Sequence, residues 1–146
     1  ISSESNESYM LGAGKSLLVH DDVDTMEKKP ACAAYTDFLL RVAREEDVPE
    51  IVMAVMPCMV GYRFVFEELL RRCPAVLEGP YAPLVRDYTA PEYAAACAEW
   101  TDFTNALCAP LPAERRAHLI DLFVQASAHE LYFWQMAGGK PPKDPD

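Results

Sequence analysis

The feature that most constrains this chain is the helical spacing of its apolar residues, which continues almost without a break from Pro30 to the glycines at 138–139. Apolar side chains recur there every three to four residues, and no run shows the strict alternation of a half-buried strand. The chain has 146 residues, 51% of them hydrophobic, which is enough for one buried core. The sequence therefore predicts an all-α fold.

Proline and glycine divide this stretch into four long helices and one short one. We expect the first three helices over residues 31–45, 49–72 and 84–88. The fourth is expected to begin at a Thr89–Glu92 capping box and to end at residue 107, and the fifth to run from about Pro112 to residue 137. The polar residues 1–29 are predicted to be an irregular lead-in, residues 30–139 the domain, and residues 140–146 a frayed tail.

The charge balance excludes several classes of partner. A formal net charge of −10 and a pI near 4.7 cannot neutralise rows of phosphates, so we expect no nucleic-acid partner and no anionic membrane surface. The most apolar stretch, residues 48–62, is interrupted by Pro49, Glu50 and Pro57, so we also expect no membrane-spanning helix. The polar start has no signal-peptide pattern, which favours a cytoplasmic location.

The five cysteines form no C-x-x-C pair and no Cys/His metal spacing. We therefore expect reduced thiols, no metal and no cofactor. Since the chain begins with Ile1 rather than Met, we interpret it as a processed or truncated piece of a longer protein.

The second predicted helix carries a candidate nucleophile. Cys58 and Tyr62 are four residues apart and share a helix face, next to Pro57, which removes one helical hydrogen bond. A thiol and a phenol placed together beside a kink can face one pocket. The alternative is that Cys58 is a small core residue, as most free cysteines on apolar helices are.

The last predicted helix carries a candidate acid. Glu130 falls within an apolar stripe formed by Leu119, Phe123, Ala126, Phe133, Trp134 and Ala137. Burial there favours the protonated carboxyl, the form that can donate a proton. The alternative is that Glu130 turns to the rim and pairs with an arginine or solvent. The three histidines, His20, His118 and His129, are predicted to be surface residues.

Three short blocks in this order resemble the TenA/thiaminase II family: residues 34–40 (AYTDFLL), the Met56-Pro57-Cys58 segment with Tyr62 one turn later, and Glu130 followed by residues 133–137 (FWQMA). The resemblance extends over about residues 30–138. It implies a haem-oxygenase-like helical bundle without haem, incomplete at its N-terminus, because the N-terminal helices of the family have no counterpart here.

The resemblance also implies a function. It predicts an enzyme, a hydrolase of the thiaminase II type, that acts at the aminomethyl group of aminopyrimidines in thiamin salvage, on degraded thiamin or on thiamin itself. Cys58 then matches the family nucleophile and Glu130 the acid/base residue. Tyr35, Tyr62 and Tyr88 match the tyrosines that bind and orient the pyrimidine. Tyrosine hydroxyls near Cys58 are expected to stabilise its thiolate, since no histidine lies at a suitable spacing. The expected assembly is a homo-oligomer, a tetramer by resemblance.

A different class of function is also open. A truncated or degenerate relative would bind a pyrimidine, or a protein partner, without catalysis. An oxidase of the haem-oxygenase-like type would need His and Glu ligands at helix-facing spacings, which the sequence does not contain.

Overall fold

The computed structural model describes residues 27–139. Five α-helices and one 3₁₀ turn make up this part of the chain: α2 (Pro30–Glu45), α3 (Val48–Arg72), η2 (Pro74–Glu78), α4 (Ala82–Tyr88), α5 (Pro91–Cys108) and α6 (Ala113–Ala137). No strand occurs between residues 27 and 139, so the predicted all-α fold is confirmed. The predicted lead-in, apart from residues 27–29, and the predicted tail lie outside the described residues, as does His20.

The long helices begin and end within a few residues of the predicted positions, but one predicted cap is wrong. Thr89 was expected to cap the start of α5, yet the N-cap residue of α5 is Ala90, without a side-chain hydrogen bond. The Thr89 hydroxyl instead donates to the carbonyl of Val85, 2.7 Å away, at the end of α4. Because Thr89 follows α4 directly, its hydroxyl bonds to the helix behind it rather than to the one ahead.

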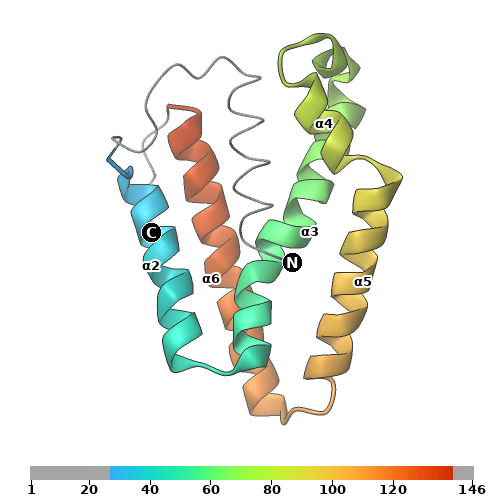
Figure 1. Ribbon diagram of the computed structural model, residues 1–146. Coiled ribbons are helices and arrows are strands. Elements are labelled where there is room, and N and C mark those ends of the chain that lie inside the picture. The colour runs from blue at the N-terminus through green and yellow to red at the C-terminus, as the bar shows by residue number, and fades with distance from the viewer. Residues whose placement is uncertain (1–26, 140–146) are drawn as a thin grey trace.

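Helix α3 is the central element of the fold. It contacts α2, α4, α5, α6 and η2, and Figure 1 shows α6 and α2 on one side of it and α5 on the other. The core lies where α2, α3 and α6 meet and is formed by Phe38, Val42, Ala54, Leu122 and Ala126. The predicted apolar stripe of α6 is buried only in part, because Leu119 and Ala126 are buried whereas Trp134 and Ala137 are exposed.

One described helix, α3, is long and apolar enough to cross a membrane by length and composition alone, so the absence of a membrane-spanning helix stays a prediction. This helix has 25 residues and contains an 18-residue window with a mean hydropathy of 1.4. The interruptions by Pro49, Glu50 and Pro57 do not stop the helix. Glu50 and Pro57 are both buried against other helices of the chain, as in the core helix of a globular domain.

A buried ion pair joins the start of α3 to α6. The Glu50 side chain is only 2% exposed, and its carboxylate accepts hydrogen bonds from Arg115 at 2.6 Å and 2.8 Å. Arg115 also donates to Asp47, 2.9 Å away. The hydrogen bonds from Arg115 lower the pKa of Glu50 below its ordinary value. The pair holds the two helices together at the end where α3 begins.

Candidate functional site

Cys58, Glu130, Tyr35 and Tyr62 come together between α2, α3 and α6. The hydroxyl of Tyr35 donates a hydrogen bond to Oε1 of Glu130, 2.8 Å away, across 95 positions of sequence. Glu130 is half-buried, and its charge and hydrogen bonding also act on Cys58 and Tyr62. The thiol and the carboxyl, which come from two different helices, therefore face the same site.

The thiol of Cys58 is held in its neutral form. Its side chain reaches the surface, but the surrounding protein, the negative charge of Glu130 and hydrogen bonding to Glu130 raise its pKa to about 11. The expectation that the tyrosine hydroxyls favour a thiolate at Cys58 is therefore wrong. A carboxylate beside a thiol opposes a second negative charge but can accept the proton of the thiol.

The hydroxyls of Tyr35 and Tyr62 remain protonated at all pH values near neutral. Burial is the main cause that raises the pKa of Tyr35, and hydrogen bonding to Glu130 raises it further. The pKa of Tyr62 is raised by burial and then by the charge of Glu130. Both residues are therefore hydrogen-bond donors at neutral pH.

An aromatic wall borders the site. It is formed by Tyr62 and Phe66 of α3, Tyr88 of α4 and Trp134 of α6. The ring centre of Tyr62 lies 5.3 Å from that of Tyr88 and 5.5 Å from that of Trp134. Tyr88, which the resemblance assigns to the pyrimidine, is stacked on Phe66 at 4.9 Å with 5° between the rings. One face of Tyr88 is thus covered by Phe66.

A groove between α3 and α6 opens beside Glu130. It encloses about 260 Å³, and its lining includes Pro57, Tyr62, Ser127, Glu130 and Trp134. Most of its surface is apolar, with the carboxyl of Glu130 as the acidic group. Such a combination of aromatic walls and one placed polar group is typical of small-molecule sites.

His129 was missed as a neighbour of the site. It was expected at the surface, but its ring is half-buried and stacked on Tyr35, with centres 5.4 Å apart and 2° between the planes. Burial lowers its pKa. The signal was present in the sequence, because residue 129 falls three positions after buried Ala126 and so on the same face of α6. His118 is exposed, as predicted, and lies 3.0 Å from Glu46.

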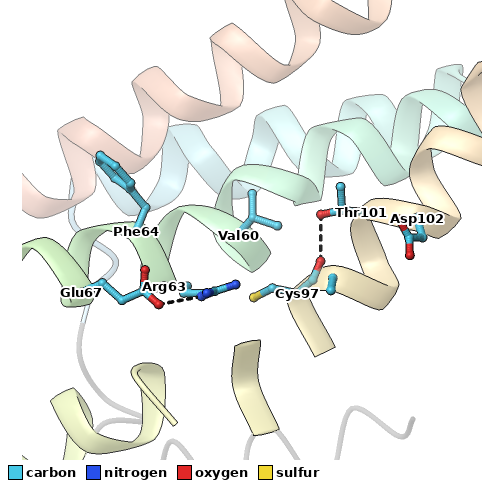
Figure 2. Close-up of a pocket in the computed structure, with 8 residues that line it drawn as sticks. Val60, Arg63, Phe64, Glu67, Cys97, Thr101 and Asp102 are labelled. Carbon is cyan, nitrogen blue, oxygen red and sulfur yellow. Dashed lines mark hydrogen bonds and ion pairs between the residues drawn. The ribbon is translucent and has the colours of Figure 1, made fainter. Parts of the chain in front are cut away.

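A second pocket, of about 390 Å³, lies between α3 and α5. Figure 2 shows the Arg63–Glu67 ion pair and the hydrogen bond from Thr101 to the carbonyl of Cys97 in its wall. Since these groups bind one another at 2.8 Å in both cases, they are less available to a ligand. Within residues 27–139 no group of three His, Cys, Asp or Glu side chains is placed to hold a metal ion.

Comparison with known proteins gives a consistent set of relatives. The chain is 33% identical over 115 residues to an uncharacterized protein of Haemophilus influenzae, covering 79% of this chain and 54% of that protein. It is 25% identical over 119 residues to an aminopyrimidine aminohydrolase of Halalkalibacterium halodurans, covering 80% of this chain and 52% of that enzyme.

A longer relative comes from fission yeast. The chain is 28% identical over 114 residues to a putative hydroxymethylpyrimidine/phosphomethylpyrimidine kinase 2 of Schizosaccharomyces pombe, covering 78% of this chain and 21% of that protein. The chain thus spans about half the length of the two bacterial relatives and about a fifth of the yeast one.

Residues 18–140, most of the sequence, match the TENA/THI-4/PQQC family. The chain belongs to the TENA/THI-4/PQQC family.

Proposed function

We propose that this chain is part of a hydrolase that acts on the aminomethyl group of aminopyrimidines in thiamin salvage. The observation that carries the proposal is the convergence of Cys58, Glu130, Tyr35 and Tyr62 on one site beside a groove. The aminopyrimidine aminohydrolase among its relatives supports the substrate class. Tyr35, Tyr62 and Tyr88 bind the ring, Cys58 is the nucleophile, and Glu130 transfers protons.

Because the pKa of Cys58 is raised, the first proton transfer must take the proton from its thiol. As the sulfur bonds to an electron-poor ring carbon, the thiol proton passes to the carboxylate of Glu130. The exocyclic C–N bond then breaks, and Glu130 returns that proton to the departing amine. Water adds to the exocyclic carbon and gives one proton to Glu130, the C–S bond breaks, and Glu130 passes that proton to the sulfur to restore the thiol. The net reaction converts an aminomethyl group and water into a hydroxymethyl group and ammonia.

Release of ammonia from an aminomethylpyrimidine tests this function. Cys58→Ser should lower the rate at least about 100-fold, since a serine hydroxyl is a far weaker nucleophile here. Cys73→Ser is the matched control, because Cys73 is also exposed but lies at the end of α3, outside the site. A Cys58→Ser protein that keeps its full rate contradicts the nucleophile.

Binding without turnover is the second candidate. It is favoured by the raised pKa of Cys58, because a thiol held in its neutral form is a weak nucleophile. Calorimetric titration with the same aminomethylpyrimidine separates the two. Heat of binding without ammonia release supports the binding protein, and ammonia release supports the hydrolase.

We further propose that the protein is cytoplasmic, does not bind nucleic acid or membranes, and forms a homo-oligomer, a tetramer by resemblance to the family. The net charge of −10 supports the absence of nucleic-acid and membrane partners. The exposed apolar residues Phe64, Val124 and Leu131 support the assembly.

A further inference from the structure

One backbone carbonyl beside the candidate nucleophile receives two side-chain donors from another helix. The oxygen is that of Met59, the residue after Cys58. Tyr93 of α5 donates its hydroxyl to this oxygen at 2.7 Å, and the thiol of Cys97 lies 3.4 Å from it. Tyr93 and Cys97 are one helical turn apart, so they reach the same point of α3 together. Figure 2 shows the Cys97 side chain directed from α5 toward α3.

The location of this contact is significant because α3 lacks one of its helical hydrogen bonds next to Cys58. Pro57 has no N–H, so the carbonyl of Met53 loses its helical partner at the position just before Cys58. The donors from α5 hold the chain on the other side of Cys58. A carbonyl oxygen has two lone pairs, so Met59 can accept from Tyr93 in addition to its helical hydrogen bond.

Tyr93 also touches the aromatic wall. Its ring packs edge-on against Tyr88, with centres 4.9 Å apart and 83° between the planes. Tyr88 in turn packs against Tyr62. One side chain therefore contacts both the backbone that carries the thiol and the tyrosine assigned to the substrate ring.

We propose that Tyr93 is a positioning residue that fixes Cys58 relative to Glu130. The effect of Tyr93 on turnover rests on the proposed function, whereas its effect on the position of Cys58 is independent of that function. The hydroxyl of Tyr93 sets the position of the peptide after Cys58, and Cys97 contributes a second, longer contact. Neither side chain is assigned to touch the substrate.

Tyr93→Phe tests the proposal, since it keeps the ring and its contact with Tyr88 and removes only the hydroxyl. Alkylation of Cys58 by iodoacetamide is followed by peptide mass spectrometry as a function of pH. Because a looser Cys58 feels less of the charge of Glu130, its alkylation midpoint should fall by about half a pH unit, or about threefold in rate at pH 8. Tyr81→Phe is the control, because Tyr81 is exposed and lies outside the site.

The outcomes are distinct. A midpoint that is unchanged in Tyr93→Phe overturns the proposal, even when the variant melts at a lower temperature, because lost stability alone does not move it. Where ammonia is released, Tyr93→Phe should also lower kcat about tenfold and leave KM within about twofold. A shifted midpoint in a protein that releases no ammonia refutes the proposed hydrolase and supports the positioning role. Cys97→Ser, which keeps a donor, should behave like the wild type.

Discussion

Glu130 is the residue on which the polar contacts of the site converge. It accepts a hydrogen bond from the hydroxyl of Tyr35, and its charge adds to burial, the main cause, in raising the pKa values of Cys58 and Tyr62. Burial and a carboxylate in this position keep the Cys58 thiol protonated at rest. In the proposed reaction the carboxylate also takes the thiol proton as the sulfur bonds to the substrate, so one group would both restrain and activate the proposed nucleophile.

This dual role predicts how the thiol responds when the charge is removed. At pH 8, a pKa of about 11 leaves roughly one Cys58 in a thousand as thiolate. In Glu130→Gln the charge is gone and the pKa falls, so alkylation of Cys58 at pH 8 should become about tenfold faster. Alkylation of exposed Cys73 serves as the internal reference and should not change. Equal rates at Cys58 in the two proteins would show that Glu130 does not control the thiol.

At the scale of the helices, an ion pair between Glu50 and Arg115 joins the first turns of α3 and α6. Glu50 is buried, whereas Arg115 remains about one-third exposed, with a side-chain exposure of 36%. The loss of each partner therefore has a different cost in stability. Removing the arginine leaves a buried carboxylate without its donors, but removing the carboxylate leaves an arginine that can turn to solvent.

We accordingly expect Arg115→Ala to lower the free energy of unfolding by about 3 kcal/mol and Glu50→Gln to lower it by less. Urea titrations of both variants at pH 7 measure this. The pKa of Glu50 is lower in the folded chain than in the unfolded one, so its stabilising contribution is present above the unfolded pKa and is lost as pH falls through the folded value. Equal losses in the two variants, or a larger loss in Glu50→Gln, would contradict this account.

The elements were largely predictable from the sequence because their signals are local. Pro30, Pro49 and Pro91 stand in the first turns of helices, and apolar residues at helical spacing continue each helix from there. The role of Thr89 and the burial of His129 were not predicted, since each depends on which neighbouring helix lies closest.

The neutral thiol was missed for a related reason. Tyrosines at helical spacing were expected to stabilise an anion at Cys58. Burial of the thiol and the approach of a carboxylate from another helix reverse that expectation. Neither the burial nor the distance between residues on two helices can be read from spacing along one of them.

At the scale of the whole molecule, an apolar face of α3 and α6 is exposed within residues 27–139. Phe64 is 71% exposed, Val124 59% and Leu131 55%, and Phe64 and Leu131 line the groove beside Glu130. Val124 and Leu131 are seven residues apart, so they lie on one stripe of α6. Exposed apolar patches of this kind are typical of surfaces that bind another protein surface.

Self-association through this face is therefore expected. Sedimentation velocity should give a species heavier than the 16.3 kDa of one chain. The double variant Val124→Lys, Leu131→Lys should shift it toward the monomer, because two charges would be buried without partners. Val48→Lys is the control, since Val48 is equally exposed but lies at the start of α3. A wild-type protein that sediments as a single chain contradicts the expected oligomer.

The hydrogen bond between Tyr35 and Glu130 ties the first described helix to the last. Its two ends are 95 positions apart, so it forms only when both α2 and α6 are docked on α3. A chain in which either helix is undocked lacks this contact, and undocking of α6 also removes the carboxylate of Glu130 from Cys58. In the proposed hydrolase, heating should therefore abolish ammonia release no later than it melts the helices, because the site exists only while α2, α3 and α6 stay docked.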